Sequence, residues 1–299
     1  MQNLILGYTL AIVSSIFHTL YIIPRKLSNQ KPQYYTLYMS IGFVISSILI
    51  CWIYAIKGYQ LDLTNPLLIY AAIAGVLSMV ASISLVIAID KIGMSRSNQW
   101  KNFQGPIGAL LIFFIFGEAS TTKIYFLFLA IIAIFSSAML LTIRNEKEGE
   151  TFDKKGIVYA LISALFYGVN ALMRKYTSDA NLIYEQQLYS AVFMLFTCLI
   201  YIVIKDKSMK KVGKLVSKDN SLAILAGIVY YFATYFFITA YKYIQGSIAY
   251  TIVQLNTIFT IFFGICVFKE LAFKKNWLRI TLGVILAIVG LVVLMIAQK

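Results

Sequence analysis

The sequence predicts an all-α, polytopic membrane protein with ten transmembrane helices, arranged as two inverted five-helix repeats. Three observations predict this fold class. Of the 299 residues, 60% are hydrophobic and only 13% are charged, whereas a soluble domain carries about a quarter charged residues. Apolar runs of about 20 residues recur along the chain, long enough to cross the hydrocarbon core of a bilayer as helices. The second half of the chain also resembles the first.

The apolar runs define the expected helices. The first run has no basic residue before it and no small-residue cleavage site after it, so we interpret it as a retained span rather than a signal peptide. Together the runs predict a multi-pass protein of the cell membrane. The ten expected spans are residues 4–23, 34–56, 66–89, 95–116, 124–143, 156–173, 183–204, 221–241, 247–268 and 277–297.

An internal repeat predicts the domain organisation. Residues 7–26 align without a gap with 156–175, and residues 74–118 align with 226–270. The expected units are a first repeat at 1–143, a polar linker at 144–155 and a second repeat at 156–299. Five helices are an odd number, so the second repeat enters the membrane from the opposite side. Such inverted repeats are typical of secondary transporters, which hold the substrate near the midplane of the bilayer.

The positive charge follows the loops. The net charge of +14 is spread over short segments between spans, a distribution that indicates anionic lipid headgroups rather than nucleic acid. Most of the Lys and Arg residues fall after odd-numbered spans. The positive-inside rule therefore predicts that both termini lie outside and that the central linker lies inside the cell.

Polar side chains within the spans share helical faces. Because a polar group facing lipid is costly, we expect these faces to point inward. The alternative is that they form hydrogen bonds between packed helices. Amides beside aromatic rings suit a neutral polyhydroxylated ligand, since hydroxyls bind amides and sugar C–H faces stack on rings. The predicted substrate-binding residues are His18, Tyr21, Asn98, Asn102, Tyr167, Asn170, Tyr250 and Gln254.

Charged residues near the spans suggest further roles. Asp90 and Glu185 are candidate proton carriers for coupled transport, and each is equally well explained as an interfacial carboxylate. We expect Lys101 to extend toward the membrane surface, the alternative being contact with an anionic substrate group. Pro106 is expected to kink its helix and to leave the carbonyl of Asn102 without a helical donor.

Enzymatic signatures are missing from the sequence. The chain has one histidine, and its three cysteines are far apart. No metal-ligand spacing, cofactor motif or paired carboxylates within the spans are found, so we expect no metal, no cofactor and no enzymatic activity. A receptor is disfavoured by the even number of spans and by the duplication.

Two segments, 88–118 and 240–270, end in Gly-Glu at Glu118 and in Lys-Glu at Glu270. With ten spans in a five-plus-five repeat, the chain resembles the drug/metabolite transporter superfamily with its EamA-like fold. These segments look most like its bacterial glucose/ribose porter branch. The resemblance implies sugar uptake coupled to a proton or sodium ion, with export of amino acids, other metabolites or drugs as the alternative. Members often have cytoplasmic termini, the opposite of the orientation that the loop charges predict.

Overall fold

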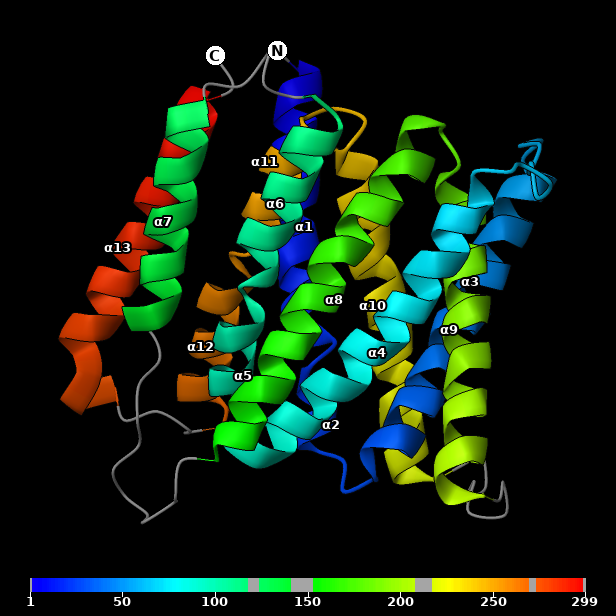
Figure 1. Cartoon of the computed structure of the whole chain (residues 1–299), viewed down its shortest axis with the longest axis horizontal. Coiled ribbons are helices and arrows are strands. Elements are labelled where there is room, and N and C mark those ends of the chain that lie inside the picture. The colour runs from blue at the N-terminus through cyan, green and yellow to red at the C-terminus, as the bar shows by residue number, and fades with distance from the viewer. Residues whose placement is uncertain (1, 118–123, 141–152, 208–216, 269–272, 298–299) are drawn as a thin grey trace.

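The computed structural model describes residues 2–117, 124–140, 153–207, 217–268 and 273–297. Within these ranges the secondary structure is helical and contains no strand (Figure 1). Glu118 and Glu270 and most of the predicted linker lie outside them. The helices are α1 (Gln2–Leu20), α2 (Ile23–Lys26), α3 (Pro32–Ile56), α4 (Leu68–Ile92), α5 (Met94–Lys101), α6 (Gln104–Ile115), α7 (Ile124–Leu140), α8 (Lys154–Asp179), α9 (Ile183–Asp206), α10 (Lys218–Ala240), α11 (Gly246–Val253), α12 (Asn256–Cys266) and α13 (Phe273–Ala297).

Seven helical stretches in the described part of the chain are long and apolar enough to cross a membrane. Three shorter apolar helices accompany them, at Gln104–Ile115, Ile124–Ser137 and Asn276–Gly290. Large hydrophobic side chains lie exposed along these helices, for example Tyr125, which is 85% exposed. So many exposed apolar side chains need lipid around them. The chain is therefore a multi-pass, all-α membrane protein.

Two of the expected spans are each interrupted near their middle. Asn102 and Phe103 separate α5 from α6, while Gln254 and Leu255 separate α11 from α12. The first break falls where Pro106 was expected to disturb the helix. The expected free acceptor is not formed, however. The carbonyl of Asn102 accepts a hydrogen bond from the Gly105 N–H at 2.9 Å, because the chain tightens into a turn at the break.

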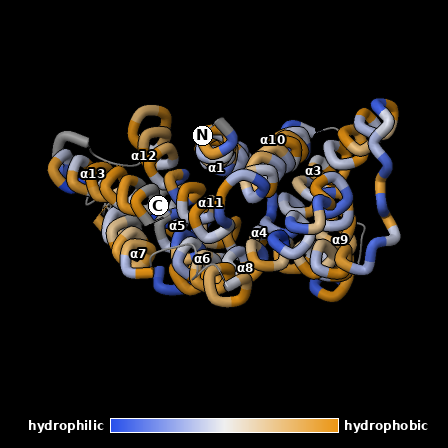
Figure 2. The backbone as a smooth tube through the Cα atoms, turned by 90° about the horizontal axis from the view of Figure 1, so that it is seen from above, coloured by the Kyte–Doolittle hydropathy of each residue, from blue (hydrophilic) through white to orange (hydrophobic). Residues whose placement is uncertain are grey.

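The helices pack as one bundle with a pair of helices at its side. In the centre, α4 packs against α8 and α9, while α10 packs against α1 and α3. Helices α7 and α13 pack on each other at one side of the bundle, as the view from above also shows (Figure 2). The start of α1 and the end of α13 lie at the same end of the bundle (Figure 1).

Glycines such as Gly227 and Gly75 permit close approaches of helix backbones in the centre of the bundle. A Cβ at Gly227 of α10 would lie 1.9 Å from the carbonyl oxygen of Met39 on α3. A Cβ at Gly75 of α4 would lie 2.5 Å from the carbonyl oxygen of Ser190 on α9. Small residues at helix contacts are how membrane helices gain van der Waals packing, since lipid is as apolar as their side chains. Replacement of either glycine requires the two backbones to separate.

Candidate functional site

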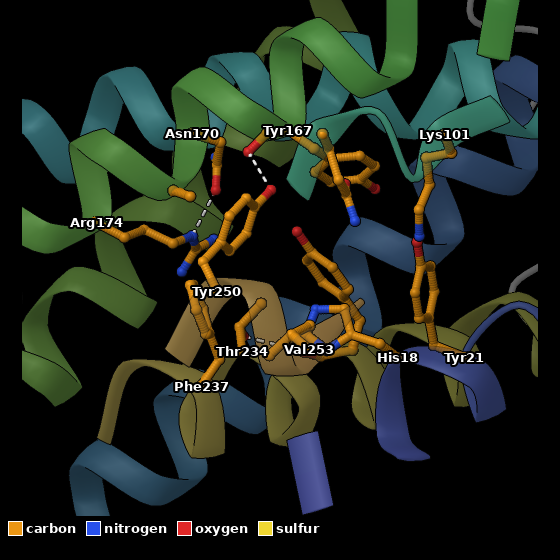
Figure 3. Close-up of a pocket in the computed structure, with 13 residues that line it drawn as sticks. His18, Tyr21, Lys101, Tyr167, Asn170, Arg174, Thr234, Phe237, Tyr250 and Val253 are labelled. Atoms are coloured by element: carbon orange, nitrogen blue, oxygen red, sulfur yellow. Dashed lines mark hydrogen bonds between the residues drawn. The ribbon is translucent and has the colours of Figure 1, made fainter. Parts of the chain in front are cut away.

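A cavity lies in the bundle between α1, α5, α8, α10 and α11 (Figure 3). Its free volume is about 20 Å³, room for a water molecule and too little for a sugar. A sugar therefore fits this cavity only if the surrounding helices move apart. Its walls combine tyrosines, amides and cations: His18, Tyr21, Lys101, Gln104, Tyr167, Asn170, Ala171, Arg174, Tyr230, Thr234, Phe237, Tyr250 and Val253.

Five of the eight predicted substrate-binding residues line this cavity. They are His18 and Tyr21 from the first repeat and Tyr167, Asn170 and Tyr250 from the second. The helical faces identified from spacing converge on one space because α1, α8 and α11 meet there. Their binding of a substrate stays a prediction.

The other three predicted residues lie outside the cavity lining. The Asn98 amide donates to the Asn256 side chain and to the Thr260 hydroxyl, both at 3.0 Å. The Gln254 side chain accepts from the Gln104 amide at 3.1 Å. Both residues thus link packed helices, as in the alternative interpretation of the polar faces. The buried Asn102 side chain has no hydrogen-bond partner within the described residues.

From the sequence we expected Lys101 to extend to the membrane surface. In the structure it lies in the cavity wall instead. It is 1% exposed, and its Nζ lies over the rings of Tyr21 and Tyr167, 5.9 and 5.7 Å from their centroids. The reason is the short helix α5, which ends at Lys101 and packs against α4 and α8. The break at Asn102 therefore puts the lysine inside the bundle.

Arg174 is a second buried cation, which the sequence analysis placed beyond the end of its span. Helix α8 continues past it, and Arg174 is 1% exposed. Its Nε donates to Asn170 Oδ1 at 2.7 Å and its Nη1 donates to Gln187 Oε1 at 3.1 Å, while Nη2 has no partner among the described residues. The spacing from Tyr167 and Asn170 on one helical face was the sequence signal for this position.

The amide of Asn170 anchors Arg174 to helix α4. Its Nδ2 donates to the carbonyl of Ala74 at 2.5 Å and to Ser78 Oγ at 2.9 Å. A side chain held at both ends by hydrogen bonds has a defined position. Arg174 and Asn170 thus form one edge of the cavity, with Lys101 at the opposite edge (Figure 3).

Aromatic rings cover the rest of the cavity wall. The rings of Tyr21 and Tyr230 lie 5.2 Å apart, and His18 meets each of them edge to face. The Tyr250 hydroxyl donates to the Tyr167 carbonyl at 3.0 Å. The cavity therefore offers flat apolar faces together with fixed hydrogen-bonding groups, the combination that sugars need.

The two predicted proton carriers lie outside the cavity lining. Asp90 is bound by Arg25, whose Nη2 lies 2.6 and 2.5 Å from the two carboxylate oxygens. Glu185 is fully buried. One of its oxygens accepts from the Asp62 backbone N–H at 3.1 Å, and the other has no partner in the described part of the chain. Their role in coupling stays a prediction.

The fold defines a multi-pass membrane protein with a polar cavity inside its helical bundle. A family profile described as "Sugar transport protein" matches residues 49–297. The chain belongs to this sugar transport protein family, which makes it a transporter of a sugar-like solute. Membership of a transporter family and the membrane-helical fold indicate a protein that is not an enzyme.

Two further comparisons concern relatives and fold. No curated protein matches the sequence. One solved structure, described only as the crystal structure of a protein, has a TM-score of 0.70 and 13% sequence identity; the match covers 99% of this chain and 98% of that one. At this identity the likeness shows the fold alone. The fold therefore occurs in a chain of very different sequence.

Proposed function

We propose that the protein is a secondary active transporter that moves a neutral sugar, such as glucose or ribose, by alternating access. The cavity between α1, α5, α8, α10 and α11 is its binding site. The observation that carries this proposal is a cavity with amide and tyrosine walls inside a chain of the sugar transport protein family. The sugar hydroxyls bind Asn170, Gln104 and His18, and the sugar ring stacks on the tyrosines.

The proposed inverted repeat of ten spans is consistent with alternating access. The aligned segments pair α1 with α8 and α4 with α10, and α3 and α9 are the helices between them in the two halves. The contacts of the helices follow these pairs: α1 packs on α10 as α8 packs on α4, and α3 packs on α10 as α9 packs on α4. Because the two halves make equivalent contacts, they can exchange their conformations. One arrangement then opens the site to one side of the membrane and the other opens it to the opposite side, which is the basis of alternating access. Membership of the drug/metabolite transporter superfamily is part of this proposal.

The interrupted helices support the same symmetry. The break between α5 and α6 and the break between α11 and α12 fall at positions that the repeat aligns, Asn102 with Gln254 and Phe103 with Leu255. Interrupted helices near the substrate are a recurrent feature of transporters, since their ends move without breaking a whole span. These breaks are the proposed hinges of the transporter.

The Arg25–Asp90 ion pair is the proposed gate at one end of the bundle. A second, smaller cavity shares Tyr21 with the main one, and Arg25 forms part of its wall. Tyr21 thus contributes to the walls of both cavities, and the wall of the second includes Arg25. In the sequence most Lys and Arg residues between spans follow odd-numbered spans, and Arg25 follows the first span, so this end is the proposed cytoplasmic end. Arg25, Lys101 and Arg174 are buried and are therefore not loop charges. Without them, most of the Lys and Arg residues between spans still follow odd-numbered spans.

Export of amino acids or drugs is the alternative on the same scaffold. An amino acid presents an ammonium group, which needs a carboxylate in the site. No acidic residue is found among the described residues that line the cavity. The cavity chemistry therefore favours a sugar over an amino acid.

The test is uptake of labelled glucose and ribose by the purified protein in proteoliposomes, with and without an imposed proton or sodium gradient. Tyr21→Ala removes one aromatic wall and is expected to raise the KM by about three- to tenfold, from the value of one aromatic contact. Tyr125→Ala, at an exposed position, is the matched control and leaves the KM unchanged. Absence of uptake of both sugars by folded protein contradicts the proposal.

A further inference from the structure

We propose that Lys101 carries the proton that couples sugar transport to a proton gradient. The ammonium form accompanies the sugar through the membrane, and the empty transporter returns with a neutral amine. This inference rests on the proposed function and names the coupling ion and its carrier. It assigns the proton to a residue of the cavity wall in place of Asp90 and Glu185.

The surroundings of Lys101 are the first argument. Its Nζ lies within the cavity wall and contacts the rings of Tyr21 and Tyr167. No hydrogen bond or ion pair to another described residue accompanies these ring contacts. At 5.9 and 5.7 Å, both rings are at the outer limit of a cation–π interaction, so they replace little of the hydration that a buried ammonium loses.

Two other cations of the bundle interior, Arg25 and Lys175, show the contrast. Arg25 is paired with Asp90 at 2.5 Å. Lys175 also lies over two rings, those of Phe116 and Tyr241, but its Nζ has the Asp179 carboxylate at 2.6 Å. Lys101 has the rings without the carboxylate. Burial without a counter-charge disfavours the charged form of an amine.

The groups that face Lys101 across the cavity do not supply the missing charge. They are His18, Tyr21, Tyr167, Arg174, Tyr230 and Tyr250. Arg174 is itself a cation and stays charged under all conditions that a protein tolerates. Asp90, the carboxylate of α4, is already held by Arg25. In the closed, empty cavity the lysine can lose its proton, whereas the arginine cannot.

A sugar changes this balance. The sugar's hydroxyl oxygens accept hydrogen bonds from the three N–H groups of an ammonium. The empty cavity does not provide such acceptors. In the proposed cycle the cavity opens to the side of high proton concentration, the amine takes up one proton, and the sugar binds beside the ammonium. After opening to the other side, the sugar leaves, and as the empty cavity closes again the ammonium releases one proton to the water on that side. One proton and one sugar cross together, and the closed empty form carries neither.

The experiment compares proton-driven accumulation with counterflow exchange of labelled glucose in the same proteoliposomes. In one-to-one symport, a gradient of one pH unit supports about tenfold accumulation. We expect Lys101→Met to abolish this accumulation and the accompanying proton uptake, measured with an enclosed pH dye. We also expect Lys101→Met to keep measurable counterflow, with a KM raised about tenfold by loss of a charge-assisted hydrogen bond. Lys101→Arg cannot release its proton and is expected to exchange sugar without net uptake.

Lys175→Met is the matched control, because it removes a lysine over two aromatic rings outside the cavity lining. It should accumulate glucose as the unchanged protein does.

Several results overturn the inference. If Lys101→Met accumulates glucose with a pH gradient, or if the unchanged protein transports sugar without regard to the gradient, the proton is carried elsewhere or not at all, and the sugar transporter stands. If glucuronate replaces glucose as the preferred solute and Lys101→Met loses only glucuronate, the lysine is a fixed counter-charge. If no sugar is transported, the proposed function and this inference both fail.

Discussion

The Arg25–Asp90 ion pair offers the sharpest test of how the bundle closes. Its arginine side chain is 5% exposed, and its aspartate side chain is 38% exposed. Besides Asp90, Arg25 binds the Gln30 carbonyl through Nη1 at 2.6 Å and lies over the ring of Tyr35. The perturbation is Asp90→Asn, which keeps the shape of the side chain and removes its charge. Arg25 is then left buried with its remaining neutral partners.

The exposure of Arg25 and Asp90 sets the loss of unfolding free energy expected for Asp90→Asn. Removal of one partner of a fully buried pair costs about 3–5 kcal/mol, and an exposed pair is worth about 0–1 kcal/mol. With one buried and one partly exposed partner, we expect a loss of about 2 kcal/mol. That loss corresponds to a decrease in Tm of about 4 °C for a chain of this size.

The assay is thermal unfolding of the purified protein in one detergent, followed by intrinsic fluorescence. Lys91→Gln is the control at the neighbouring position, because Lys91 and Asp153 form an ion pair in which both side chains are 33% exposed. It should shift the Tm by less than about 2 °C. The double variant Arg25→Gln, Asp90→Asn should recover part of the loss, since it leaves no unpaired charge. Equal shifts for Asp90→Asn and Lys91→Gln, or strictly additive effects in the double variant, refute the reasoning.

Three further predictions follow from single contacts. Gly227→Val forces α10 away from the carbonyl of Met39, which a Cβ would approach to 1.9 Å; we expect almost no monodisperse protein in size-exclusion chromatography. Tyr250→Phe removes the hydrogen bond to the carbonyl of α8 at 3.0 Å; we expect a Tm lower by about 2 °C, from about 1 kcal/mol. Lys91 and the first N–H groups of α8 lower the pKa of Asp153 below 3.8. The stability that Asp153 adds is therefore full above its unfolded pKa and disappears as the pH falls through the folded one, so the Tm difference from Asp153→Asn should vanish in strong acid.

The sequence was sufficient for the membrane class and for several cavity residues. Helical spacing puts Tyr167, Asn170 and Arg174 on one face of α8, and the cost of polar groups in lipid turns that face inward. Both arguments depend only on local geometry and on the solvent. The same arguments turn Asn98 and Gln254 inward, where they bond to neighbouring helices outside the cavity lining, because a face that points inward meets either a cavity or a neighbouring helix. Spacing along one helix does not distinguish the two.

Arg25 and Arg174 show the limit of sequence reasoning most clearly. They occupy aligned positions of the two halves, yet Arg25 is paired with Asp90, while Arg174 binds two amides and its Nη2 has no partner in the part of the chain that the structure describes. The residue that the repeat aligns with Asp90 is Lys242, so the second half has no acid at that place. The sequence alone does not show that Asp90 is the partner of Arg25, because that pairing depends on which helices pack together.

What the sequence by itself determined is the class of the molecule: apolar runs of membrane length, polar faces that turn inward, and two halves that resemble each other. Tertiary structure decided which polar residues share one closed cavity, and it moved Lys101 from an expected surface position into the wall of that cavity. The physical reason is that composition and periodicity report the preference of each helix for lipid or protein. The depth of a charge and the presence of its partner depend on where a helix is interrupted and on which helices pack beside it.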